Sequence, residues 1–345
     1  MNAPISSVSR AEQPGKQIKE KASFANAARN YSMLAAVAVV WIAFEYATNG
    51  VFLGPRNLSN LMRQMAVTGV LSVGMLMVIV IGEIDLSVGS LVGLTGMTAA
   101  LVQASRGWSL VPTLLAALVL GLVIGALQGS LTAYARVPSF IVTLGGLLAW
   151  RGVTKGVSAG GTIPIQSERF SAIGQWYLDK PVGIALVGVG IAALAASEWL
   201  KRRTRNRLGL ANASPARQIA NVAVPSAFAV VLVAVLNAYE GVPVPVVIFV
   251  VVALFGSFVM MNTIPGRYMY AVGGNREAAR LSGINTKTLA IAVFGVMGVL
   301  AGLAGVIYTA RVGSASPDAG LLLELDAIAA CVIGGASLMG GRGAV

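Results

Sequence analysis

The sequence has no histidine, one cysteine, and only 13 aspartates and glutamates among its 345 residues. Without histidine, the commonest general base and metal ligand is missing, which excludes a Ser-His-Asp catalytic set and the usual zinc and iron sites. A single cysteine cannot form a disulfide within the chain, and Cys331, in an apolar run, is interpreted as a packing residue. These shortages argue against an enzyme and against a bound metal or cofactor.

A nucleotide-binding loop is also missing, and charged residues are scarce. The chain contains no G-x-x-x-x-G-K-[ST] loop, so it does not bind and hydrolyse ATP by that route. Only 11% of the residues are charged and 56% are hydrophobic, against about 25% and 45–50% in soluble globular domains. A water-soluble surface needs more charge than this, so the sequence predicts an integral membrane protein.

Apolar segments of about the length that crosses a bilayer recur along the chain. A membrane-spanning helix needs about 20 mostly apolar residues. The segments are 32–48, 65–82, 88–103, 110–133, 139–156, 182–200, 219–237, 243–262, 289–310 and 326–340. We therefore predict an all-α polytopic transmembrane helix bundle with about ten spans, some of them short. Residues 1–30 form a basic tail, and residues 31–345 form the transmembrane domain.

Glycine is abundant, with 41 residues, and it recurs at four-residue spacing in two of these segments. The two sets are Gly121, Gly125, Gly129 and Gly152, Gly156, Gly160. Small residues on one helix face let neighbouring membrane helices approach closely. Both sets are therefore predicted to be helix-packing faces.

Basic residues are clustered between the apolar segments and account for the net charge of +12. The strongest cluster has no acid: Lys201, Arg202, Arg203, Arg205, Arg207 and Arg217. Such clusters mark cytoplasmic loops that face anionic lipid, and without interleaved aromatics they do not indicate nucleic-acid binding. The basic segment 263–288 is also predicted to be cytoplasmic, as is the N-terminal tail. Arg56 and Arg63 fall on the outer side in this scheme and count against it.

Two similar acidic segments interrupt apolar runs. Glu83, Asp85 and Ser87 form the first, and Glu324 and Asp326 form the second. A carboxylate at membrane depth costs about 2.5–3.5 kcal/mol on insertion scales. Two interpretations fit: the residues break and cap helices, or they contact a solute or a proton directly. In the predicted topology the two segments lie at opposite membrane faces, which suggests an inverted repeat.

A short helix is predicted in the cytoplasmic segment 273–285. Gly274 and Asn275 suit a turn and helix start, and Gly283 suits a helix stop. Ala278, Leu281 and Ile284 recur at helical spacing. The helix could lie on the lipid interface or against a partner protein, and the spacing alone leaves both open.

Four segments in order carry a resemblance that covers nearly the whole chain. They are EIDLSVGS at 83–90, VPSFIVTL at 137–144, GNREAARLSGIN at 274–285 and ELDAIAA at 324–330. These segments resemble the permeases of monosaccharide ATP-binding-cassette (ABC) importers, the group of the ribose and xylose systems. Within that group the segments are most similar to the D-xylose permeases, especially at Glu83, where the ribose permeases tend to have another residue.

The resemblance implies a bacterial inner-membrane protein that acts as a homodimer with a cytoplasmic ATPase subunit and a periplasmic sugar-binding protein. It implies alternating access, driven by a coupling helix that docks into the ATPase. The helix residues are Gly274, Asn275, Glu277, Ala278, Ala279, Leu281 and Gly283. The other expected contacts are with membrane lipid, and the sugar itself is not named by the sequence.

Permeases of this kind continue past 340–343 with further apolar spans, so C-terminal spans of the family are expected to be missing from the sequence. The alternative function is an ion-coupled secondary transporter or channel for a small polar solute, with Glu83 and Asp85 as proton sites.

Overall fold

The computed structural model describes residues 35–211 and 214–345, so the predicted basic tail, residues 1–30, lies outside the described residues. The chain divides into two compact units, Met1–Leu58 and Ser59–Val345. The described part of the first unit contains an apolar helix, Ala35–Ala47, and the start of the next helix. The second unit contains all the remaining elements.

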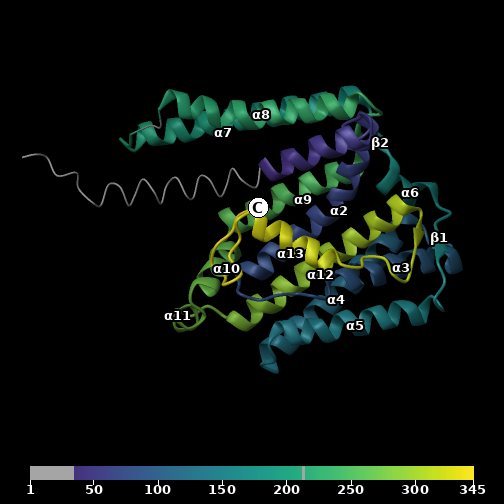
Figure 1. Cartoon of the computed structure of the whole chain (residues 1–345). Helices are drawn as coiled ribbons and strands as arrows, with labels where there is room; N and C mark the ends of the chain where they lie inside the picture. Colours follow the sequence, from purple (N-terminus) through teal and green to yellow (C-terminus); the bar gives the residue numbers. More distant parts are fainter. Residues whose placement is uncertain (1–34, 212–213) are drawn as a thin grey trace, which may run out of the picture. The chain divides into compact units, whose positions relative to one another are not determined.

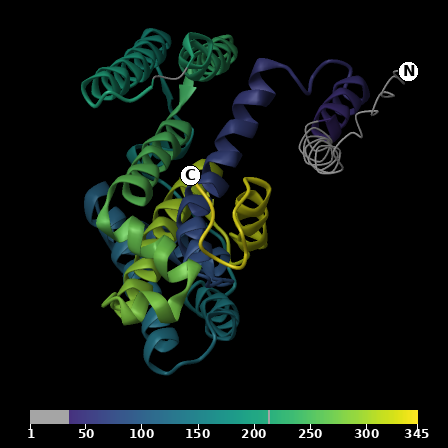
Figure 2. The same ribbon diagram turned by 90° about the vertical axis from the view of Figure 1, so that its left-hand side faces the viewer.

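The described chain is almost entirely helical (Figures 1 and 2). The helices are α2 (Pro55–Val80), α3 (Val88–Arg106), α4 (Leu110–Tyr134), α5 (Ser139–Val157), α6 (Glu168–Gln175), α7 (Lys180–Arg207), α8 (Pro215–Asn237), α9 (Val244–Asn262), α10 (Ile264–Gly274), α11 (Arg276–Leu281), α12 (Thr286–Val312) and α13 (Leu323–Ile333). Four two-residue strands form two antiparallel pairs: β1 (Ile163–Pro164) with β4 (Ser314–Ala315), and β2 (Tyr177–Leu178) with β3 (Val242–Pro243).

Among the described residues, seven helices are long and apolar enough to cross a membrane: α2, α3, α4, α7, α8, α9 and α12. The predicted all-α membrane bundle is therefore confirmed. Each of the ten predicted segments overlaps a helix, although α13 ends at Ile333 and leaves the rest of the segment 326–340 non-helical; α5, α13 and Ala35–Ala47 are not among the seven. The figure of about ten spans thus stays a prediction. α13 has only 11 residues, which agrees with the expectation that some segments are short.

The core of the second unit is formed mainly by α2, α3 and α12, and α4 packs closely on α12. A Cβ on Gly121 or Gly125 would overlap a backbone carbonyl oxygen of α12, that of Gly298 or Phe294. Glycine is thus required at this crossing, and the predicted packing face on α4 is confirmed. The second predicted face packs against no helix of the described chain, because Gly152, Gly156 and Gly160 have no described atom within 4 Å of an added Cβ.

The two glycine sets give a matched test of this packing. We expect Gly121→Ala to lower the Tm of the detergent-solubilised protein by several degrees, since overpacking a tight contact costs about 1–3 kcal/mol. Gly152→Ala should leave the Tm unchanged or raise it slightly, because alanine is favoured over glycine inside a helix. Thermal unfolding of the two variants checks this, and equal shifts would contradict the assignment of the interface.

Helices α7 and α8 form a hairpin on the side of the second unit opposite α5 (Figures 1 and 2). They pack mainly against each other, and few of their residues are buried: Gly183 in α7 and Leu236 in α8. Their exposed side chains are largely apolar. Such a surface suits lipid contact. The two acidic segments lie elsewhere, in the rest of the bundle.

Candidate functional site

The first acidic segment forms the turn between α2 and α3. Asp85 is only 2% exposed there, and its Oδ1 accepts hydrogen bonds from the Ser87 backbone N–H (2.8 Å) and Oγ (2.7 Å). Ser87 Oγ also lies 3.0 Å from Gln128 Oε1 of α4. Burial raises the pKa of Asp85 to about 6, while the hydrogen bonds from Ser87 act to lower it.

Helix α5 holds the same turn from the other side. The backbone N–H of Ile84 donates to Ser139 Oγ (3.1 Å), and Thr143 Oγ1 donates to the Ile84 carbonyl (3.3 Å). Ser87 sits at the N-cap position of α3 without a side-chain cap hydrogen bond in the described chain. The turn is therefore stabilised by Asp85 and by two neighbouring helices, and not by a conventional side-chain cap.

Two buried N–H groups converge beside this turn. Gln128 Nε2 and Trp150 Nε1 have no hydrogen-bond partner among the described residues. Both lie against Gly146, where an added Cβ would overlap Gln128 Nε2. The sequence analysis did not single out these two side chains. A glutamine in a predicted span was an available signal, because a buried polar group usually has a hydrogen-bond partner. Together with Asp85 and Ser87 they form a buried polar cluster.

The second acidic segment opens α13. Glu324 is 5% exposed, and its Oε2, which has no hydrogen-bond partner in the described chain, lies against Gly89 in the first turn of α3. Gly89 is four positions beyond Asp85 along the chain. The two acidic segments thus lie near each other. The prediction that they lie at opposite faces is wrong, because the segment 313–322 returns along α3, with Ala319 against Gly93 and Gly320 against Gly89. The inverted repeat was inferred from that placement and loses this support.

Asp326, the second acid of that pair, has a different environment. It is exposed and lines a cavity of about 630 Å³ between α2, α9, α12 and α13. The other polar side chains on this wall include Gln64, Thr68, Ser72 and Arg311. The structure therefore separates the two acids, with Glu324 packed against α3 and Asp326 facing open space.

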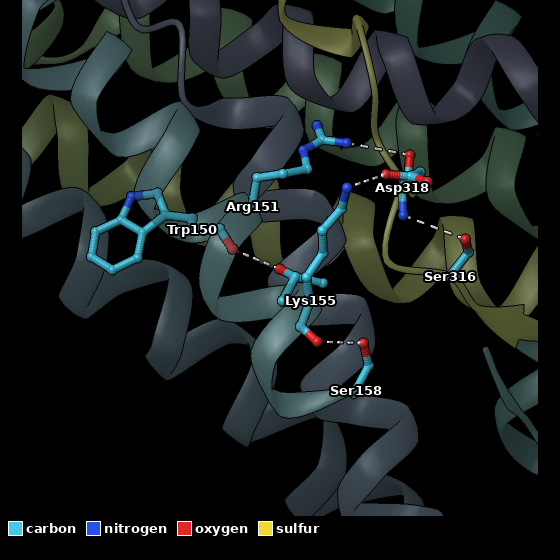
Figure 3. Close-up of polar contacts among 7 residues, drawn as sticks. Trp150, Arg151, Lys155, Ser158, Ser316 and Asp318 are labelled. Atoms are coloured by element: carbon cyan, nitrogen blue, oxygen red, sulfur yellow. Dashed lines mark hydrogen bonds and ion pairs between the residues drawn. The ribbon is translucent and has the colours of Figure 1, made fainter. Parts of the chain in front are cut away.

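The segment before α13 is also tied to α5 (Figure 3). Lys155 Nζ lies 3.4 Å from Asp318 Oδ1, and Arg151 donates to the Asp318 backbone carbonyl (3.4 Å). Both partners in the ion pair are largely exposed, so it contributes little stability by itself. Sequence reasoning did not single out these residues, although two cations in the predicted span 139–156 were a signal.

The predicted docking helix is present as α11. Asn275 Oδ1 accepts the Ala278 N–H (2.9 Å) at its start, and Gly283 has a left-handed φ of 87° just after its end, which confirms the predicted start and stop. Leu281 is 77% exposed. Ala279 is buried, so its prediction as a docking residue is corrected: it faces the body of the protein.

Within α11, Glu277 and Arg280 form an ion pair of 2.6 Å, and Arg280 lowers the pKa of Glu277 by hydrogen bonding and charge. Glu83, by contrast, pairs outside its own segment. Its Oε1 lies 2.8 Å from Arg276 of α11. The first acidic segment is thus connected directly to the predicted docking helix.

Comparisons with known proteins agree with this architecture. The family described as branched-chain amino acid transport system / permease component matches residues 57–342. The xylose transport system permease protein XylH of Escherichia coli K12 is 45% identical over 315 residues, which are 91% of this chain and 80% of the relative. The corresponding protein of Haemophilus influenzae is 44% identical over 91% of this chain and 84% of its own.

A more distant relative has a related name. The ribose import permease protein RbsC of Escherichia coli K12 is 35% identical over 91% of this chain and 79% of the relative. No solved structure matches the chain. Since the family match covers most of the sequence and both kinds of relative exceed 30% identity over most of their lengths, the chain belongs to this family of transport-system permease components.

Proposed function

We propose that this permease, the non-catalytic membrane subunit of a sugar ABC importer, carries D-xylose or a closely related sugar. The observation that carries the proposal is the difference in identity between relatives, 45% to a xylose permease against 35% to a ribose permease over equal lengths. The acidic segment that includes Glu83, where the sequence is most similar to the xylose type, supports the same subgroup.

The end of the bundle that bears α11 is the cytoplasmic end. Arg276 and Arg280 of α11 and the basic end of α7, with Lys201 and Arg202, supply the positive charge that cytoplasmic loops carry. With alternating helices, this orientation puts the N-terminal tail in the cytoplasm and the segment before α13 towards the outside. The protein is a multi-pass component of the bacterial inner membrane.

Helix α11 docks into a separate ATPase subunit. Its capped start orients it, and the exposed Leu281 offers apolar surface that a partner protein could bury. A periplasmic sugar-binding protein delivers the sugar at the opposite face, and a second copy of the permease completes the pathway. ATP binding and hydrolysis then move α11 and switch the pathway between its two openings.

The cavity lined by Asp326 is the part of this chain best suited to border the sugar pathway. Thr68, Ser72 and Asp326 supply hydroxyl and carboxylate oxygens along an otherwise largely apolar wall, and sugar hydroxyls need such partners when they leave water. Asp85 and Ser87 instead use their hydrogen bonds within the turn, which favours the helix-break interpretation for them.

Reconstitution tests the proposal. The permease, co-expressed with its ATPase and binding protein and purified into proteoliposomes, should take up radiolabelled D-xylose only when ATP is supplied, and excess unlabelled ribose should compete weakly. An ATPase without its catalytic residue is the control. Uptake that does not depend on ATP and is abolished by a proton ionophore would instead support the alternative, an ion-coupled transporter with Glu83 and Asp85 as its proton sites.

A further inference from the structure

An ion pair joins the predicted docking helix to the interior of the bundle. Glu83, at the turn after α2, is 8% exposed, while its partner Arg276, the first residue of α11, is 51% exposed; their charged atoms are 2.8 Å apart. The contact is one of opposite charges, because Glu83 Oε1 has no aligned hydrogen-bond donor among the described residues. A buried carboxylate is costly unless it is paired. The pair therefore favours one position of α11 relative to the turn.

The surroundings of Glu83 make Arg276 its specific link to α11. The carboxylate faces a cavity of about 290 Å³ that is also lined by Arg136 and Lys287. Lys287 stacks over the Tyr134 ring at 4.8 Å, and within the described chain the ion pair of Glu83 is with Arg276. Arg136 and Lys287 are outside α11, so Arg276 alone of these three cations would move with that helix.

Backbone contacts brace the same junction. The carbonyl oxygen of Val80, the last residue of α2, accepts a hydrogen bond from the Gly341 N–H (2.9 Å). Gly273, near the end of α10, lies so close to Val80 that an added Cβ would overlap its carbonyl oxygen. The chain that leads into α11 is thus pressed against the end of α2. A displacement of α11 must either carry the turn with it or break the ion pair.

The turn that would be carried is the one that holds the buried polar cluster. Glu83 is two residues from Asp85, which bonds Ser87, which in turn reaches Gln128 of α4. Ile84, between them, is bonded to Ser139 of α5. A displacement of Glu83 therefore reaches α3 and α5 through existing hydrogen bonds. It reaches α4 through the 3.0 Å contact between Ser87 Oγ and Gln128 Oε1.

We propose that Glu83 and Arg276 are positioning residues that couple α11 to the α2–α3 turn, so that movement driven by the ATPase is passed through this ion pair to the transmembrane helices. The inference rests on the proposed docking of an ATPase at α11. It assigns Glu83 a role in coupling, in place of contact with sugar or with a proton.

The test is a double-mutant cycle in the reconstituted importer. Arg276→Gln and Glu83→Gln should each retain the ATPase on purification and hydrolyse ATP within about two-fold of wild type, yet lower sugar uptake at least ten-fold. The double variant should lose no more than either single variant, because both remove the same interaction. Arg136→Gln is the matched control: it removes a cation from the same cavity but leaves the ion pair, and should transport within two-fold of wild type.

Several outcomes would overturn the inference. They are normal uptake in either single variant, equal loss in Arg276→Gln and Arg136→Gln, or multiplicative loss in the double variant. If the fall in uptake is fully explained by a lower yield or a lower Tm of the variants, the ion pair stabilises the fold, and this result also rejects a coupling role. If the wild-type permease itself fails to retain an ATPase, the proposed function fails, which is a different and separately visible result.

Discussion

Leu281→Asp is expected to abolish retention of the ATPase and to lower ATP-driven sugar uptake by 30-fold or more. Leu281 is 77% exposed on α11. If it is one of the few residues that dominate the proposed interface, its loss costs about 2 kcal/mol or more, which is about 30-fold or more in affinity. A carboxylate in its place would also have to lose its hydration on docking. Affinity purification of the tagged permease, followed by quantification of the bound ATPase, measures the effect.

A second test and a control come from the same chain. The second test is Glu277→Arg, on the exposed side of α11, which should also weaken docking because it reverses a charge and breaks the pair with Arg280. Leu208→Asp replaces another exposed leucine, 66% exposed at the end of α7, and should leave ATPase retention unchanged. Ala279→Arg is unsuitable, since Ala279 is buried and the variant should misfold.

A different result would favour the other interpretation of α11. If Leu281→Asp binds the ATPase normally, the helix is not a docking element, and the interpretation as an interfacial helix on the lipid surface gains support. Flotation of liposomes with a peptide spanning 274–285 would then be the decisive measurement, because it reports lipid binding without the rest of the permease.

Asp85→Ala is expected to lower sugar uptake at least ten-fold while expression falls less than two-fold. The substitution removes the acceptor for both the N–H and the hydroxyl of Ser87, and a buried donor left without a partner costs about 1–3 kcal/mol. We expect this cost to change the conformation of the turn without unfolding the protein, because several other buried helices stabilise the bundle. Uptake per permease molecule, normalised by quantitative immunoblot, checks the prediction.

Asp85→Asn separates the two interpretations of this residue. Asparagine keeps an oxygen that can accept both hydrogen bonds but carries no charge, so a role in shaping the turn predicts that at least a third of the uptake remains. If Asp85→Asn is as inactive as Asp85→Ala, the charge itself is needed, as in contact with the solute or a proton. Equal loss of expression and uptake in Asp85→Ala would instead indicate a purely structural role.

Much of this protein could be predicted from the sequence because the relevant signals are local. A run of apolar residues predicts a helix whatever that helix packs against, so each of the ten predicted segments overlaps a helix, and seven of these helices are long and apolar enough to cross a membrane. The start and stop of α11 were equally predictable, since Asn275 and Gly283 act within a few residues of themselves.

What only the tertiary structure decided is which partner each face and each polar group meets. Glycines at equal spacing look alike in sequence, but those of α4 press against α12, whereas Gly152 faces open space. Likewise the carboxylate of Glu83 meets Arg276, far along the chain, and Glu324 meets Gly89. Periodicity and composition describe one segment at a time, whereas these contacts depend on how separate helices pack together. The sequence therefore showed which residues are acidic, basic or small, but not which of them meet.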